Sequence, residues 1–209
     1  GGTGNDNLYL YDGVPVYSVS HLAGLYSAFN TDVVDNVNFF KSGFPASYGG
    51  RLSSVVEVNT RDGSMTDYKG SFTVGLINGS IQYEGPIVKD RTSFNVAMRR
   101  SWLDVLSVPA FAVLRTIRKK SSDPYYELMD AGYSMTDFNA KVTHKIAEDN
   151  VLRFGFIAGK DALKFEHREI RSVVGEDYKF RWGNVVGYAD WQNIIADDVH
   201  YDLKVYYTQ

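Results

Sequence analysis

The stretch Phe138-Asn139-Ala140-Lys141-Val142-Thr143-His144-Lys145-Ile146 alternates strictly between two kinds of side chain. One series reads Phe, Ala, Val, His and Ile, and the other reads Asn, Lys, Thr and Lys. Because successive side chains of a β-strand point to opposite faces, this period of two predicts a strand with one apolar face. The last run of the chain, from Val199 to Tyr207, shows the same alternation and predicts a second such strand.

The alternation recurs from about Tyr68 to the end of the chain and predicts seven strands. Their expected ranges are 69–77, 80–87, 92–103, 134–146, 151–163, 178–195 and 199–209. Tight turns follow the second, fourth and sixth of these strands, near Lys89, Asp149 and Asp197. Longer connections follow the third and the fifth, at 103–134 and 164–177. In an up-and-down sheet this places short turns at one rim and long loops at the other, the asymmetry of outer-membrane β-barrels.

Strand length favours the same class of protein. About ten residues at ~3.3 Å each, tilted by ~40°, cover roughly 25 Å, the height of the lipid-facing band of such barrels. Strands of soluble proteins cluster nearer five or six residues, although a soluble antiparallel sandwich alternates for the same reason and stays an alternative. Seven strands are fewer than the eight of the smallest bacterial barrels, so we expect an internal fragment of a larger chain.

Composition excludes several other classes. Of the 209 residues, 44% are hydrophobic and 22% are charged, which is typical of a folded protein. The net charge of −3 gives no electrostatic case for nucleic acid, and the absence of cysteine excludes disulfides and thiolate chemistry. No apolar run reaches the ~18–20 residues of a membrane helix, so a bilayer could be spanned only by a β-barrel.

Residues 1–65 have a different texture, with short segments broken by Gly and Asn. A small strand is expected at 8–11, followed by a turn at Asp12-Gly13-Val14-Pro15. A short helical turn is expected at 32–36, then strands at 37–40 and 52–60. This pattern predicts a small α+β unit with much irregular backbone.

The same 65 residues resemble the C-terminal part of the plug domain of TonB-dependent outer-membrane receptors. The resemblance lies in Asp12-Gly13-Val14-Pro15, in Phe44-Pro45-Ala46-Ser47-Tyr48-Gly49-Gly50-Arg51 and in the strand that leads to Thr60. Order and spacing fit the family, although Asp35 and Asn38 stand where it usually has Glu. The version in this chain is similar to a subgroup that often carries a carboxypeptidase-regulatory-like domain. The motif residues are Asp12, Gly13, Pro15, Gly43, Pro45, Tyr48, Gly49 and Gly50.

The resemblance implies an overall organisation. Residues 1–65 would be the end of a plug, and residues 66–209 would be the first seven strands of a 22-stranded transmembrane β-barrel that encloses it. It implies an outer-membrane receptor of a Gram-negative bacterium, with lipid around the barrel. Uptake of a scarce ligand of unknown identity would be powered by TonB, through a segment missing from this chain. By analogy a surface lipoprotein could act as a lid, and the alternative is a non-transporting barrel or a soluble β domain in a cell-surface complex.

Arginines are the candidates for the contact between plug and wall. If Phe94, Val96 and Met98 face lipid, Arg99 faces the plug; Arg51 and Arg61 lie in or beside the plug. The basic run 115–120 could form an amphipathic turn that touches anionic lipid. Neither metal-ligand spacing among the four histidines nor a nucleophile elbow is present, so neither an enzyme nor a cofactor is expected.

Overall fold

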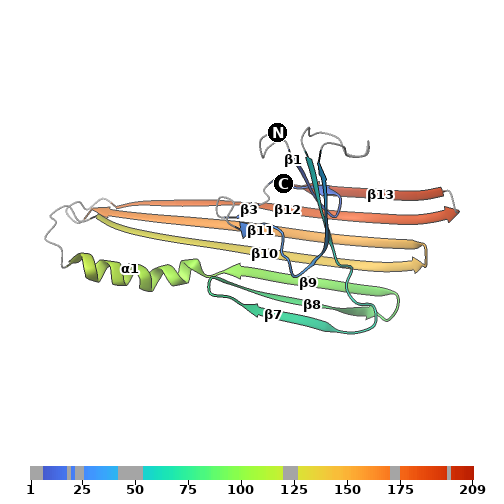
Figure 1. The fold of residues 1–209 in the computed structure, drawn as a ribbon, viewed down its shortest axis with the longest axis horizontal. Helices are drawn as coiled ribbons and strands as arrows, with labels where there is room; N and C mark the ends of the chain where they lie inside the picture. Colours follow the sequence, from blue (N-terminus) through green and yellow to red (C-terminus); the bar gives the residue numbers. More distant parts are fainter. Residues whose placement is uncertain are drawn as a thin grey trace.

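A computed structural model of the chain describes residues 7–17, 20–21, 26–41, 54–119, 127–169, 175–196 and 199–209. In this part of the chain the fold is mostly β. A long antiparallel sheet forms one layer, and a smaller unit built from the N-terminal residues stands against one of its faces (Figure 1). We call residues 7–65 the N-terminal unit and the long sheet the large sheet.

The large sheet contains seven strands in sequence order, each antiparallel to the next. This simple meander agrees with the predicted number of strands. Their bounds are β7 (Lys69–Val74), β8 (Asn78–Val88), β9 (Thr92–Ser101), β10 (Glu127–Ala147), β11 (Asn150–Glu169), β12 (Gly175–Ala196) and β13 (Val199–Thr208). β7 and β13 are its two edge strands.

The described part of the meander agrees with the predicted placement of the turns. The β8–β9 and β10–β11 turns lie at one end of the sheet, with the end of β12 and the start of β13; α1, the end of β11 and the start of β12 lie at the other (Figure 1). The turn predicted at Asp197 and residues 170–174 lie outside the described residues. The first hairpin differs from the prediction, because the chain turns at 75–77 rather than at Asn78-Gly79. The amide of Gly75 donates to the carbonyl of Asn78 at 2.8 Å and closes this turn.

The long connections also differ from the prediction. β10 begins at Glu127, seven residues earlier than expected, and β11 and β12 extend into the expected loop at 164–177. Residues expected to be an irregular excursion form the helix α1 (Leu103–Lys119), which contains Pro109. The helix follows β9 and runs beside β10, where β9 has ended (Figure 1). No helix in the described ranges is long and apolar enough to cross a membrane.

The N-terminal unit contains a four-stranded mixed sheet and a two-stranded one. The first has the order β2 (Val14–Pro15), β1 (Asn7–Tyr11), β6 (Ser54–Thr60) and β5 (Val34–Lys41), with β1 parallel to β6. The second pairs β3 (Ser20–His21) with β4 (Tyr26–Ser27). The helical turn expected at 32–36 is wrong, because β5 already begins at Val34.

The hairpin between β1 and β2 is set by its sequence. Tyr11 pairs with Val14, so the loop is only Asp12-Gly13, and both residues have positive φ values of 48° and 78°. A two-residue hairpin of type I′ requires positive φ at both positions, and Asp-Gly is a favoured pair there. The turn projects towards the large sheet, where Val14 packs with Val186 and Tyr188 in a small shared core.

Candidate functional site

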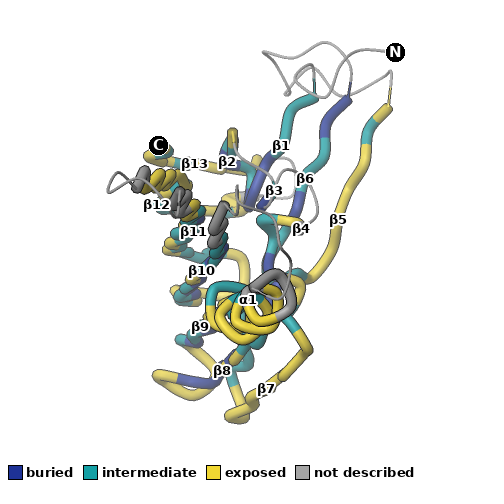
Figure 2. The backbone as a smooth tube through the Cα atoms, turned by 90° about the vertical axis from the view of Figure 1, so that its left-hand side faces the viewer, coloured by how far each residue is buried: buried dark blue, intermediate teal, exposed yellow. Residues whose placement is uncertain are grey.

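The two faces of the large sheet carry opposite kinds of side chain. We call the face towards the N-terminal unit the inner face and the other the outer face; Figure 2 shows the unit standing on one side only. On β9 and β10 the buried inner positions are mostly polar. They include Ser93, Asn95, Arg99, Asp137, Asn139, Lys141 and Thr143.

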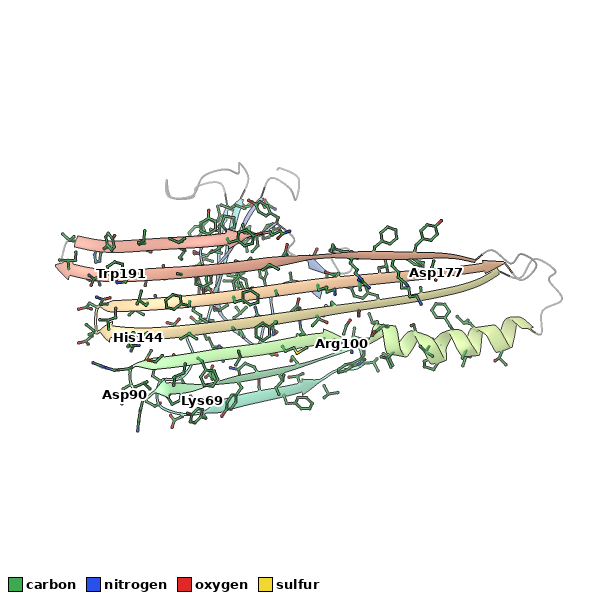
Figure 3. All side chains as sticks on the ribbon, turned by 180° about the vertical axis from the view of Figure 1, so that it is seen from behind. Lys69, Asp90, Arg100, His144, Asp177 and Trp191 are labelled. Carbon is green, nitrogen blue, oxygen red and sulfur yellow. The ribbon has the colours of Figure 1, made fainter. Side chains whose placement is uncertain are left out.

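Large apolar side chains lie between these positions on the outer face. Met98 is 45% exposed, Phe138 is 37% exposed and Phe154 of β11 is 50% exposed. Figure 3 views this outer face, with the N-terminal unit behind the sheet. A water-soluble sheet places its apolar face in the core and its polar face in solvent, so the large sheet is inverted with respect to that rule.

The first cluster on the inner face is organised by Asp12 at the tip of the β1–β2 hairpin. Its carboxylate accepts hydrogen bonds from the amide and hydroxyl of Thr60, at 2.8 and 2.6 Å, and from the Tyr188 hydroxyl at 2.5 Å. Its backbone carbonyl accepts from Lys204 Nζ at 2.7 Å. Tyr188 can lie across β11 because Gly155 has no side chain there; a Cβ at that position would collide with the Tyr188 ring. One turn of the N-terminal unit thus contacts both β12 and β13.

Lys141 and Arg153 extend this cluster along the inner face. Lys141 Nζ donates to the Thr60 carbonyl at 2.8 Å and lies 3.0 Å from Asp62 Oδ1. Arg153 Nε lies 3.1 Å from both carboxylate oxygens of Asp62. Burial by itself raises the pKa of Asp62, but the charges of Lys141 and Arg153 outweigh it and hold that pKa below its usual value. We use the name Asp12 cluster for the residues Asp12, Thr60, Asp62, Lys141, Arg153, Tyr188, Asp190 and Lys204.

A polar cavity of about 320 Å³ lies beside the Asp12 cluster, between the N-terminal unit and the large sheet. Its lining holds five acids, contributed by both parts of the fold, and three bases, all contributed by the large sheet. Among the lining residues are Asp12, Asp62, Asp190, Lys141, Arg153 and Lys204. A polar cavity of this size has room for several water molecules. This part of the interface is therefore wet and held by charge rather than by apolar packing.

The second cluster on the inner face surrounds His21 on β3. The His21 Nδ1 atom lies 2.8 Å from Asp161 Oδ2, and its Nε2 atom lies 2.9 Å from Asp137 Oδ1. Arg99 Nη2 lies 2.6 Å from the other oxygen of Asp137, and the Tyr133 hydroxyl donates to Asp161. We call these five residues the His21 cluster. An imidazole of the N-terminal unit is thus held between two buried carboxylates of the sheet.

The charge of His21 follows from this geometry. Burial by itself lowers the pKa of His21, but the close carboxylates of Asp137 and Asp161 outweigh it and raise the pKa to about 9. The imidazole is therefore protonated at neutral pH. Two carboxylates then face two cations, His21 and Arg99, and the buried charges of the cluster balance.

The predicted contact arginines have different surroundings. Arg99 lies on the inner face, as the alternation of β9 predicts, is 8% exposed and donates to the Ser27 carbonyl at 2.7 Å. The Arg61 side chain turns back into the N-terminal unit and donates to the Asp32 carbonyl, while the Arg61 carbonyl accepts from Asn95 Nδ2 at 3.3 Å.

Most of the motif lies outside the described residues. Asp12, Gly13 and Pro15 are described and form the β1–β2 hairpin and its second strand. Arg51, Gly43, Pro45, Tyr48, Gly49 and Gly50 fall outside the described ranges.

Sequence reasoning missed the partners that give the interface its charge balance. His21 was counted only among four histidines without metal-ligand spacing, and Asp137, Asp161 and Lys141 were not singled out. Lys141 carried a signal, because it alternates with apolar neighbours on its strand. His21 carried none, since its partner Asp161 lies 140 positions away in the sequence. Within the described residues no group of three or more His, Asp or Glu side chains could hold a metal ion.

Comparisons with known proteins find similarity only at the level of structure. No family model and no curated protein matches the sequence. Of the solved structures, the siderophore receptor PirA from Acinetobacter baumannii is 10% identical, with a TM-score of 0.49. A mutant of the ferric enterobactin receptor PfeA from Pseudomonas aeruginosa is 11% identical, with a TM-score of 0.44.

The matches cover 98% of this chain and about 40% of the two receptors. The chain thus spans less than half the length of these receptors. With TM-scores below 0.5 and identities near 10%, these similarities establish neither a family nor a function for the chain.

Proposed function

We propose that this chain is part of a TonB-dependent outer-membrane receptor, in which the N-terminal unit is the end of the plug and the large sheet is the adjoining barrel wall. The inversion of the large sheet carries the proposal. Its apolar face is exposed while its polar face is buried under the N-terminal unit. Lipid outside and a polar lumen inside are the surroundings that suit this distribution. The motif around the Asp12-Gly13 hairpin supports the plug assignment.

The contacts of the interface suit a plug that must move. The Asp12 and His21 clusters join the two parts through hydrogen bonds and balanced ion pairs, and the polar cavity admits water. Such contacts exchange readily for contacts with water. An extensive apolar core would instead have to be exposed to water when the two parts separate, which is costly. We infer that a pull on the N-terminal unit transfers these groups to water one after another, which opens a path for the ligand along the inner face.

A reversible lock between the plug and the wall tests this function. Ser93 Oγ of β9 donates to the backbone carbonyl of Asp62 at 2.8 Å, so the two residues are neighbours across the interface, and Asp62→Cys with Ser93→Cys introduces a pair of thiols whose cross-linking is first verified by mass. These 209 residues contain no cysteine, so within them the engineered pair is the only one that can form a disulfide. The full-length protein is expressed in cells with and without TonB. Their uptake of ferric siderophores, cobalamin, oligosaccharides and peptides is then measured. We expect uptake of one of them to require TonB, to stop on oxidation and to resume on reduction.

The matched control uses the same Ser93→Cys with Thr143→Cys. These residues face each other in the β9–β10 register, so their disulfide ties the wall only to itself. Uptake through this variant should be indifferent to oxidation. If no compound of the panel is taken up in a way that requires both the protein and TonB, the result contradicts transport and favours a non-transporting barrel. Equal uptake by the oxidised and reduced Asp62–Ser93 pair would show that the interface is a static one.

A further inference from the structure

Four aromatic side chains lie together on the inner face of the large sheet, at the end near α1. Asp161 of the His21 cluster marks the inner face of β11, because its carboxylate contacts His21 of the N-terminal unit. In the β11–β12 register, the residues that share a side with Asp161 from this level towards α1 are mostly aromatic. We call four of them the ring ladder; they are Phe165 of β11 and Tyr178, Phe180 and Trp182 of β12.

The ring ladder differs from the rest of the inner face, which is polar and covered. Trp182 is 38% exposed and Phe180 is 52% exposed. The N-terminal unit stands further along the sheet, and strands β10 to β12 continue past it towards α1 (Figure 1). Exposed apolar patches with polar surroundings mark sites of interaction. The exposed surfaces of Phe180 and Trp182 are therefore available to a ligand.

Charges on the opposite face indicate that this stretch of β12 lies in water. Lys179 and Arg181 alternate with the rings, so they point outwards, and both are exposed. A charged side chain that faces hydrocarbon is costly, so under the proposed function this stretch lies beyond the lipid-facing band. Its inner face then borders the aqueous mouth of the barrel. A ligand that enters there meets the ring ladder before it meets the N-terminal unit.

The ring ladder offers no cation to an anionic ligand. Within 131–135, 161–165 and 178–182, Asp161 is the only charged residue at an inner position. Its carboxylate is already engaged by His21 and by the Tyr133 hydroxyl. An anionic iron chelate needs cationic partners for its charge, and none lies on this part of the wall. The surface therefore suits an uncharged ligand.

The spacing of the rings favours a ligand that repeats along its length. Tyr178, Phe180 and Trp182 occupy every second position of one strand, so their rings are attached about 6.6 Å apart. They stand on an open sheet face, so the edges of a bound ligand stay in water. A sugar ring fits both conditions, because its hydroxyl groups lie at its edge and its C–H face is attracted to the negative face of an aromatic ring.

We propose that the ring ladder binds a neutral oligosaccharide, with sugar rings stacked on Trp182 and Phe180 and with Tyr178 and Phe165 extending the track towards the mouth. The proposal rests on the proposed function and names the class of ligand that it takes up. Trp182 pairs with Asp161, which contacts His21. The bound sugar is thus held directly beside a contact that must open during uptake.

The experiment measures binding of fluorescently tagged, linear, neutral oligosaccharides of different linkages to the purified full-length protein, in a detergent without sugar groups. The test variant is Phe180→Ala with Trp182→Ala. Both side chains are exposed, so their loss leaves no buried cavity, and heat-modifiability of the barrel checks that the variant is folded. We expect at least one oligosaccharide to bind the natural protein, and the loss of two stacked rings to weaken its binding about ten-fold or more.

Two matched variants isolate the rings. Lys179→Ala with Arg181→Ala shortens the neighbouring side chains on the other face of the same stretch and should bind as the natural protein does. Phe180→Tyr with Trp182→Phe keeps an aromatic ring at both positions and should retain most of the affinity. Equal binding by the two alanine variants would overturn the proposal, and so would equal weakening by the ring-preserving variant and the test variant.

Other ligand classes are separated in the same assay. An anionic ferric tricatecholate, cobalamin and a neutral peptide should not displace the bound oligosaccharide. Binding of no oligosaccharide, or binding of one of these three compounds that is lost in the test variant, would overturn the assignment of the ligand class. Because the assay needs neither TonB nor uptake, these results leave the transport function standing if another compound is taken up with TonB.

Discussion

The inner and outer faces of the large sheet differ in what they require from their surroundings. On β10, Asp137, Asn139 and Lys141 are buried under the N-terminal unit and have polar partners, while Phe138 between them is exposed. In water both halves of this arrangement are costly, because polar groups lose hydration and an apolar surface stays wet. The difference teaches that the two faces suit two media, which under the proposed function are a polar plug on one side and lipid on the other.

The largest expected effect comes from breaking the inner face at Lys141. This residue is 8% exposed and is the cation nearest both Asp12 and Asp62 in the Asp12 cluster. Lys141→Met leaves these carboxylates without their shared partner, which for a buried pair costs about 3–5 kcal/mol. We expect the N-terminal unit of the full-length protein to become accessible to protease while the barrel stays folded. Lys145→Met, at the exposed end of the same strand, should leave protease resistance unchanged, and equal sensitivity of the two variants would remove Lys141 from this role.

A charge on the outer face should have a somewhat smaller effect. Leu203 pairs with Trp191 on β12 and is 47% exposed. Leu203→Arg places a charge where we expect lipid, at a cost of about 2–4 kcal/mol near the midplane of a bilayer. The fraction of heat-modifiable, assembled barrel should fall. Lys204→Gln on the inner face loses one hydrogen bond to the Asp12 carbonyl, about 1 kcal/mol, and should assemble nearly normally. Assembly reduced more by the second change than by the first would reverse the assignment of the faces.

A pH effect should follow from the His21 cluster. Its folded-state pKa of about 9 lies above the ~6.5 of an unfolded histidine, so its stabilising contribution is complete below pH 6.5 and is lost as the pH rises through 9. Asp137 and Asp161 face the imidazole directly, with Arg99 and Tyr133 behind them. Between pH 6.5 and 8.5 the attachment of the N-terminal unit should weaken by about 2 kcal/mol.

This effect is measured as the force required to extract the N-terminal unit from the barrel in a bilayer. The force should fall across that pH range in the natural protein and should vary little with pH in His21→Gln. His200→Gln, which changes a histidine exposed on β13, should keep the full response. A pH response that persists without His21 would place its origin elsewhere in the interface.

The sequence predicts the strands well because their signal is local. The alternation at 138–146 gives both the strand and the faces on which Phe138 and Lys141 lie, and the same holds for Arg99 on β9 and Leu203 on β13. Helix α1 was missed because Pro109 and several Val residues lower local helix propensity, so 103–134 was expected to be irregular. The turn at 75–77 was displaced by three residues, since Asn-Gly is also a strong hairpin signal.

The interface could be predicted only in part. Arg99 follows from the parity of one strand, and Asp12 from a turn whose chemistry is local. The pairing of His21 with Asp137 and Asp161 depends on how a distant hairpin meets β10 and β11. No spacing in the sequence encodes that meeting, because it arises only when the two parts pack together.

The membrane placement of the outer face is tested most directly by lipid quenching at neighbouring positions of β13. Leu203→Cys and Asp202→Cys each place one cysteine in these otherwise cysteine-free 209 residues of the full-length protein. Each cysteine carries the same fluorophore, in bilayers whose acyl chains bear bromine near the midplane. Because side chains at 202 and 203 point to opposite faces, we expect strong quenching of the probe at 203 and little at 202. A folded protein in which the probe at 203 is untouched by brominated lipid, or in which both probes are quenched alike, would contradict the two-medium account of the sheet.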